Sequence, residues 1–163
     1  MIKLTTPITK EKIATLSLGD TVLLSGKIFT ARDAAHKKIV EHYLATNEML
    51  LSGEVIYYAG PCPRKEREII GSVGPTTSYR MDAYSEFFLS KGCKVTIGKG
   101  NRSTQTVNLI KEYGGVHFDA IGGAGAYYKN CVKKAEVVYF EELGAEAVFC
   151  LTVVDFPLIV SIV

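Results

Sequence analysis

The sequence has few of the residues from which proteins build metal sites. Its 163 residues include three histidines and no tryptophan. The four cysteines, Cys62, Cys93, Cys131 and Cys150, stand far apart and form no Cys-x-x-Cys pair. Zinc and iron–sulfur sites usually need several such ligands at close spacing. We therefore expect no metal held by this chain alone, and four reduced, mostly buried thiols typical of a cytoplasmic protein.

Long apolar runs and clusters of charge are also missing. No stretch of about 18 uninterrupted apolar residues occurs, so a membrane-spanning helix is not expected. Residues 1–10 lack the apolar segment of a signal peptide. The net charge is only +2 and the 19 basic residues are scattered, which argues against a nucleic-acid surface. The chain, 47% hydrophobic, predicts one domain over residues 1–163 with a real core.

Strand patterns alternate with helical patterns along most of the chain. Short apolar runs rich in strand-forming residues predict strands over 21–24, 27–30, 55–59, 69–73, 95–97, 116–121, 136–140, 147–153 and 158–163. Helical spacing predicts helices over 34–44, from a Thr76 or Thr77 cap to Leu89, over 104–113 and over 126–132. This order predicts an α/β fold, a layered domain with a mixed sheet.

The first of three polar segments covers residues 30–36. Arg32 follows a predicted strand and precedes a predicted helix, the place where ligands bind in open α/β sheets. Its guanidinium could hold a carboxylate through two parallel hydrogen bonds, with Asp33 and His36 orienting it. The alternative is a surface arginine with Asp33 as a helix cap.

The second polar segment contains three consecutive hydroxyl residues, Thr76, Thr77 and Ser78, followed by Arg80. If the helix starts at Thr76, residues 76 and 80 share one face and both reach one ligand. The helix N-terminus would favour an anionic ligand. The alternative is a threonine-capped helix with an exposed arginine.

The third polar segment is GKGNRS, residues 98–103. Its two glycines allow the backbone to approach a ligand and leave Lys99 unobstructed; the alternative is a flexible surface turn. The spacing does not match a Walker phosphate loop. Residues 122–125 resemble a dinucleotide-binding loop only weakly, because the full GxGxxG spacing is absent.

Together, the three segments suit a small dianion such as a dicarboxylate. They supply guanidinium groups, an ammonium group and a hydroxyl cluster. No pairing of a strong general base with a nucleophile is evident, and cations with a hydroxyl seldom carry out a difficult elimination unaided. We therefore expect another chain to supply part of the chemistry.

The same segments resemble the β subunit, or C-terminal domain, of class I fumarate hydratases and of the related L-tartrate dehydratases. The longest matching segment is GSVGPTTSYRMD, residues 71–82. The other matching segments are LTTPI (4–8), GD (19–20), SG (25–26), ARDAAH (31–36), AGP (59–61), KGNRS (99–103), GG (122–123), ELG (142–144) and DFP (155–157). They occur in order over nearly the whole chain.

The resemblance implies a swivelling β/β/α domain that forms a separate polypeptide in two-subunit members. It also implies a partner α subunit that carries a [4Fe–4S] cluster with one open iron, and we expect an α2β2 assembly. The implied reaction is the reversible hydration of fumarate to (S)-malate, a step of the tricarboxylic acid cycle. The enzyme would be a hydro-lyase, active only with its α subunit.

By motif, Thr76 resembles the proposed catalytic base of the family, and Arg32, Arg80 and Lys99 resemble its ligands for substrate carboxylates. An unassisted threonine is a very weak base, so its role would depend on cationic neighbours or on a relay. The residues expected to support these groups are Asp33, His36, Thr77, Asp82 and Asn101.

Two further functions stay open beside fumarate hydration. The KGNRS segment resembles the fumarase version of its loop, which favours fumarate over tartrate or another hydroxy-diacid. A non-catalytic module that binds anions or serves assembly is the other alternative, although the four intact residues Arg32, Thr76, Arg80 and Lys99 argue against it.

Overall fold

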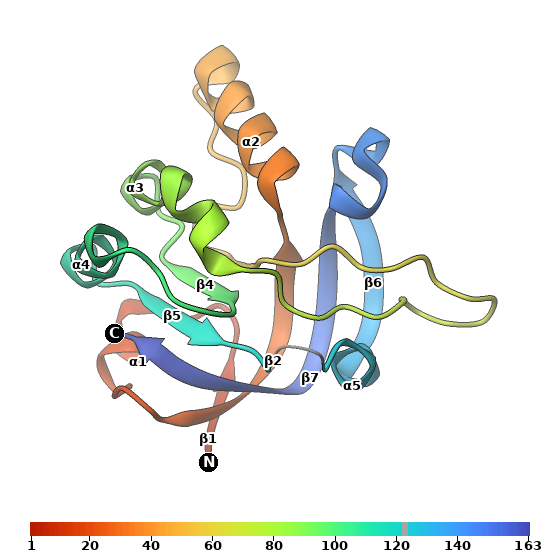
Figure 1. Ribbon diagram of the computed structural model, residues 1–163, viewed down its shortest axis with the longest axis horizontal. Helices are drawn as coiled ribbons and strands as arrows, with labels where there is room; N and C mark the ends of the chain where they lie inside the picture. Colours follow the sequence, from red (N-terminus) through yellow and green to blue (C-terminus); the bar gives the residue numbers. More distant parts are fainter. Residues whose placement is uncertain (122–123) are drawn as a thin grey trace.

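The computed structural model in Figure 1 describes residues 1–121 and 124–163. Its strands are β1 (Ile2–Thr5), β2 (Thr21–Thr30), β3 (Val55–Tyr57), β4 (Val95–Gly98), β5 (Val116–Asp119), β6 (Val132–Tyr139) and β7 (Val148–Ile162). Its helices are α1 (Lys10–Ala14), α2 (Asp33–Thr46), α3 (Asp82–Ser90), α4 (Thr104–Glu112) and α5 (Gly125–Cys131), with 3-10 turns η1 (Ser78–Met81) and η2 (Glu141–Glu146). Gly122-Gly123, part of the weak dinucleotide-loop resemblance, lies outside the described residues.

The strands form one seven-stranded mixed sheet in the order β1-β2-β3-β4-β5-β7-β6. Strands β1 to β5 run parallel to one another, whereas β7 runs antiparallel to β5, β2 and β6. Because β7 pairs with both β5 and β2, the strands β2, β3, β4, β5 and β7 close into a ring. The predicted α/β fold with a mixed sheet is confirmed.

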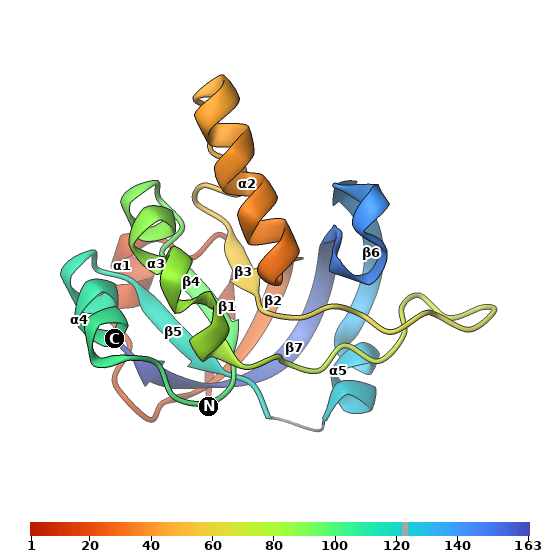
Figure 2. The same ribbon diagram turned by 45° about the horizontal axis from the view of Figure 1, so that its top comes forward.

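The apolar core has two main parts. The larger part contains the fully buried rings of Tyr57, Phe118 and Phe156, which lie on β3, β5 and β7. The other part joins the sheet to α2 and α3 and includes Ile39 and Phe88. In Figures 1 and 2, α2, α3 and α4 gather together on the side of the sheet away from α5. No helix in the described residues is long and apolar enough to cross a membrane.

Two pairs of predicted strands are in fact single long strands. Residues 21–24 and 27–30 both belong to β2, and residues 147–153 and 158–163 lie almost entirely in β7. The pairing of β2 with β7 shifts register between Leu24 and Gly26 and then continues. The turn signals in the sequence therefore mark bulges in continuous strands, which bend a strand without ending it.

The predicted strand over residues 69–73 is wrong, because this segment is irregular. Two of its apolar residues are nevertheless buried, with Ile70 5% and Val73 0% exposed, whereas Ile69 is exposed. A Cβ on Gly71 would lie 2.1 Å from the carbonyl oxygen of Cys62, so the chain folds back tightly upon itself here. Apolar residues thus reach the core without joining the sheet. In both views the connection between β3 and η1, yellow to green, extends past β6 (Figures 1 and 2).

Candidate functional site

The three predicted polar segments meet at the carboxyl ends of neighbouring parallel strands. Arg32 follows β2, and Lys99 follows β4. Thr77, in the connection between β3 and η1, forms an isolated parallel bridge with Lys99. The amide of Ser78 also donates to the carbonyl oxygen of Lys99 over 2.8 Å. This is the edge of an α/β sheet at which ligands usually bind.

Asp33, which follows Arg32 in the sequence, forms an ion pair with Arg80. The Nη2 atom of Arg80 lies 3.0 Å from Oδ2 of Asp33, so Asp33 pairs with Arg80 and not, as the sequence suggested, with the guanidinium of Arg32. The Nε atom of Arg32 is buried and has no hydrogen-bond partner among the described residues. A Cβ on Gly60 would lie 3.0 Å from Cδ of Arg32, so a glycine makes room for this arginine.

Thr76 is held by the backbone of Tyr58 and not by a helix. Both its amide and its Oγ1 donate to the carbonyl oxygen of Tyr58, over 2.7 and 2.9 Å. Helical structure begins only at Ser78, and Thr77 makes no capping bond with its side chain. The expectations of a threonine cap and of a helix face shared by Thr76 and Arg80 are therefore wrong. Because the hydroxyl proton is donated to Tyr58, the lone pairs of Thr76 Oγ1 are left to accept from a ligand.

The Lys99 loop depends on both of its glycines. A Cβ on Gly98 would lie 2.1 Å from Ser78 Oγ, and Gly100 has a φ of +78°. Asn101 is exposed and Lys99 is half-buried. Within the described part of the chain, no hydrogen bond or ion pair occupies the Lys99 ammonium. The conformation of this loop therefore depends on glycine on either side of Lys99.

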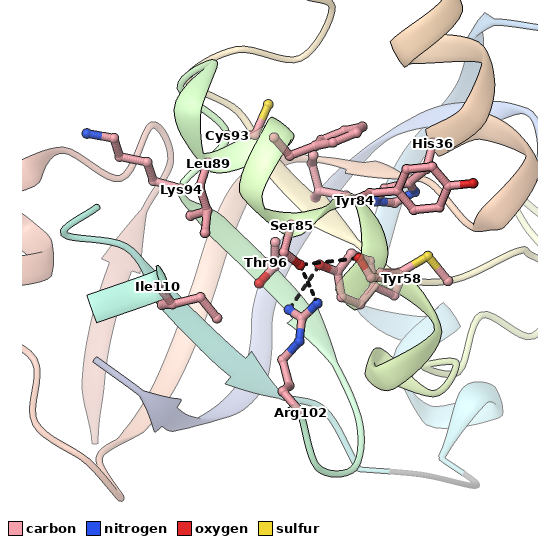
Figure 3. A pocket seen from close by; sticks show the side chains of 13 residues that line it. His36, Tyr58, Tyr84, Ser85, Leu89, Cys93, Lys94, Thr96, Arg102 and Ile110 are labelled. Atoms are coloured by element: carbon pink, nitrogen blue, oxygen red, sulfur yellow. Dashed lines mark hydrogen bonds between the residues drawn. The ribbon is translucent and has the colours of Figure 1, made fainter. Parts of the chain in front are cut away.

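Arg102 of the same loop points inward, and it is not among the site residues predicted from the sequence. Its side chain is 1% exposed, and Nε lies 2.8 Å from Oδ1 of Asp82. Nη1 donates to the hydroxyl of Tyr58 over 3.0 Å, and Nη2 donates to Ser85 Oγ over 2.9 Å. Figure 3 shows Arg102 reaching between Tyr58 and Ser85. The partners are distant in sequence, and no local pattern signals them.

Two histidines beneath the site are buried and neutral. The Nδ1 atom of His36 lies 2.8 Å from the carbonyl oxygen of Arg32 and, facing a carbonyl, must be the donor. Burial lowers the pKa of His36 from 6.5 to about 4. His117 contacts Ser78 Oγ at 3.2 Å and Thr96 Oγ1 at 2.6 Å, and burial holds its pKa well below the usual value. His36 therefore supports the backbone of Arg32, whereas its ring packs on aromatic neighbours.

An open groove lies beside Arg80, whereas only a small cavity lies beside Arg102. The groove, about 610 Å³, is lined by Asp33 and Arg80 together with residues of α3 and the start of α4. The cavity around Arg102 is only about 10 Å³, room for at most one water molecule. A ligand therefore has access to Arg80 but not to Arg102.

The cysteines do not fit an iron–sulfur cluster held by this chain. Cys93, Cys131 and Cys150 are buried and Cys62 is exposed. Among residues 1–121 and 124–163, no group of three or more His, Cys, Asp or Glu side chains could hold a metal ion. The described site therefore offers cations and a hydroxyl for an anion.

Comparisons with known proteins agree over the whole chain. The family model described as Fumarase C-terminus matches residues 1–163. The chain is 39% identical over 166 residues to a putative class I fumarate hydratase of Geobacillus stearothermophilus, covering 99% of the chain and 32% of the relative. It is 43% identical over 163 residues to a putative L(+)-tartrate dehydratase subunit beta of Methanocaldococcus jannaschii, covering 94% of the chain and 83% of the relative.

A third relative is the aerobic class I fumarate hydratase of Escherichia coli, 38% identical over 156 residues, with 91% of the chain and 28% of the relative covered. The chain thus spans about a third of these fumarate hydratases and most of the tartrate dehydratase subunit. Both names denote hydro-lyases. The chain belongs to the Fumarase C-terminus family.

Proposed function

We propose that this chain is the β subunit of a two-subunit iron–sulfur hydro-lyase that hydrates fumarate reversibly to (S)-malate. The observation that supports the proposal most strongly is the convergence of Arg32, Thr76, Arg80 and Lys99 at one edge of the sheet. Two of the relatives compared are named as class I fumarate hydratases. A third is named as a subunit beta, which supports a separate partner chain.

The three cations would bind the two carboxylates of the substrate. Arg80 is 55% exposed and meets Asp33 through Nη2 alone, so donors of its planar fork remain for a carboxylate. Arg32 is half-buried, and its buried Nε lacks a protein partner in the described residues, so the outer part of its guanidinium would meet the carboxylate. Lys99 adds a compact positive charge from the neighbouring loop.

Thr76 would orient the substrate hydroxyl or the attacking water. Its own proton is donated to the carbonyl oxygen of Tyr58, so Oγ1 is turned to accept a hydrogen bond from a second hydroxyl. A neutral threonine is far too weak a base to keep a proton unaided. We therefore propose a relay in which the hydroxyl proton of Thr76 turns from the Tyr58 carbonyl to a stronger base on the partner, while Oγ1 takes the proton from the substrate hydroxyl or water.

The [4Fe–4S] cluster of the proposed enzyme would belong to the partner α subunit. The cysteines of this chain do not fit a [4Fe–4S] cluster, so an α subunit would carry it, in an α2β2 assembly. This chain then contributes binding, orientation and the first proton contact, and the rest of the active site lies across the subunit boundary.

One relative favours a second substrate. The putative L(+)-tartrate dehydratase subunit beta shares 43% identity with this chain and is matched over 83% of its own length. Tartrate, like malate, is a hydroxy-diacid, and the same cations could hold it. A non-catalytic anion-binding module is the remaining alternative.

The test is anaerobic co-expression with an α-type chain that carries the cluster cysteines. The complex should hydrate fumarate and dehydrate (S)-malate, whereas this chain alone should be folded, colourless and inactive. A complex that acts on tartrate but not on fumarate would move the assignment to the second substrate. An iron–sulfur absorption band from this chain alone, after reconstitution, would contradict the proposed division of labour.

A further inference from the structure

Arg102 connects three segments that are far apart in sequence. Through Nε it bonds Asp82 at the start of α3, and through Nη2 it bonds Ser85 in the next turn of the helix. Through Nη1 it bonds the hydroxyl of Tyr58, whose ring lies 5.1 Å from the guanidinium carbon. The third segment is the loop that contains Arg102 itself, tied to α3 a second time by the amide of Ser103, which donates to Asp82 over 2.8 Å.

Each of these segments either contains one candidate site residue or holds one through hydrogen bonds. Tyr58 fixes Thr76, because its carbonyl oxygen accepts from both the amide and the hydroxyl of Thr76. The helix α3 continues directly from η1, which contains Arg80. The Arg102 loop begins at Lys99, whose carbonyl oxygen accepts from the amide of Ser78.

We propose that Arg102 is a positioning residue that sets the relative places of Thr76, Arg80 and Lys99. This inference rests on the proposed function, because it gives those three residues a common substrate. The geometry excludes a direct contact between Arg102 and substrate, since its side chain is 1% exposed and the cavity around it is about 10 Å³. Figure 3 shows the guanidinium enclosed between α3 and the Tyr58 ring.

Only an arginine can fill this role. Its rigid planar fork offers donors in fixed directions, and the three nitrogens here meet three different side chains. A lysine would keep the charge opposite Asp82, but its single nitrogen cannot reach all three acceptors at once. Arg102→Lys should therefore release the segments from one another while leaving the charge balance intact.

The first measurement is amide hydrogen exchange in this full chain, which needs no partner and no activity. In Arg102→Lys the amides of Thr76, Ser78 and Ser103 should exchange at least about tenfold faster, because local opening governs their protection. Amides in the pairing of β2 with β7 should keep their wild-type rates. Tyr58→Phe removes only one acceptor and should raise the same rates to a smaller extent.

The matched control is Val22→Ala, a core truncation in β2. Val22 is fully buried and pairs with Ile2 and Leu158, away from the three segments. It should lower the melting temperature by as much as Arg102→Lys or more, without a selective rise at Thr76, Ser78 and Ser103. If exchange in Arg102→Lys rises uniformly over the chain, or not at all, the positioning role is wrong.

The second measurement is steady-state kinetics of the assembled enzyme. Arg102→Lys should reduce kcat/KM by about 100-fold, since a misplacement of about 1 Å can cost that much, and Val22→Ala should leave it near the wild-type value. A wild-type complex without activity on any diacid would refute the proposed function, while the exchange experiment would still decide the role of Arg102. Wild-type kcat/KM in Arg102→Lys would overturn the positioning role even if exchange increased.

Discussion

Two arginine–aspartate pairs of similar length differ in burial. Arg80 and Asp33 form an exposed outer layer of the site, and Arg102 and Asp82 form a buried inner layer. Arg80 and Asp33 are 3.0 Å apart, with side chains 55% and 39% exposed. Arg102 and Asp82 are 2.8 Å apart, with side chains 1% and 12% exposed. Arg102 uses all three of its nitrogens on protein side chains, whereas Arg80 uses Nη2 on Asp33.

The difference in burial separates their roles. An exposed pair contributes little to stability and can rearrange when a ligand arrives. A buried pair cannot lose one partner without leaving an uncompensated charge in the protein interior. The exposed pair is therefore able to rearrange around a ligand, whereas the buried pair is suited to hold its surroundings in place.

Thr76→Val should give the largest effect, on turnover. Valine has nearly the same size but can neither donate to Tyr58 nor accept from a ligand. We expect kcat of the assembled enzyme to fall by about two to four orders of magnitude, as for a general acid–base group. The lost hydrogen bond should lower the free energy of unfolding by only about 1 kcal/mol.

Thr77→Val is the matched control for Thr76→Val, because Thr77 is exposed and the Thr76 hydroxyl is kept. An active Thr76→Val enzyme beside an inactive Thr77→Val enzyme would move the proton contact by one residue. If both variants turned over normally, proton transfer would lie wholly on the partner and this chain would be a substrate clamp.

Asp82→Asn should cause the largest loss of stability. Asparagine keeps the shape but leaves the buried Arg102 without a counter-charge, so the free energy of unfolding should fall by about 3–5 kcal/mol. Chemical denaturation of the isolated chain measures this. A loss below about 1 kcal/mol, the range of exposed pairs, would mean that burial does not distinguish the two pairs.

Arg80→Lys should show the opposite profile. Lysine keeps the charge but not the bidentate fork, so transition-state binding should weaken by roughly 2–4 kcal/mol, by analogy with truncation of a buried charge pair. The free energy of unfolding should hardly change. Wild-type kcat/KM in this variant would show that Arg80 is not a carboxylate ligand.

The two buried histidines, His36 and His117, should also make stability depend on pH. Burial lowers the pKa of His36 from 6.5 to about 4, so at pH values between these the unfolded chain binds a proton that the folded chain does not. Stability is thus complete above pH 6.5 and is lost as the pH falls toward 4, by about 3 kcal/mol from this residue. Burial lowers the pKa of His117 too, with the same sign.

Denaturation at a series of pH values, with His36→Gln as the variant and Val22→Ala, which removes no titratable group, as the control, measures this dependence. The slope between pH 6.5 and 4 should decrease in the first variant and stay the same in the second. An unchanged slope in His36→Gln would show that His36 is not the group responsible.

The sequence places Arg32 and Lys99 at the correct edge of the sheet but does not reveal the burial of Arg102, for a physical reason. Arg32 and Lys99 could be placed because each follows an apolar run that forms a strand, and the carboxyl ends of parallel strands meet at the edge where ligands usually bind. The start of the helix was misplaced, because the amide of Thr76 is already committed to Tyr58. No local pattern carries that tertiary bond.

The role of Arg102 could not be predicted for the same reason. In the sequence, Arg80 and Arg102 are equivalent charged residues in polar segments. Asp82 lies 20 residues and Tyr58 lies 44 residues from Arg102, so its burial is decided by how β3, α3 and the Lys99 loop pack together. A residue whose partners come from three segments is visible only once the segments are assembled.

Asp33→Asn should have the smallest effect on the free energy of unfolding. The response of this effect to salt distinguishes the exposed pair from the buried pair. The exposed pair with Arg80 should contribute less than about 1 kcal/mol to the free energy of unfolding. A double-mutant cycle with Asp33→Asn and Arg80→Gln isolates the coupling between the two side chains. Because the Debye length falls to about 3 Å at 1 M salt, this coupling should disappear there, whereas the loss in Asp82→Asn should persist. A coupling of several kcal/mol that resists salt would place the Arg80–Asp33 pair in the same class as the buried pair, and Arg80 would then be a structural residue that a substrate carboxylate could not readily recruit.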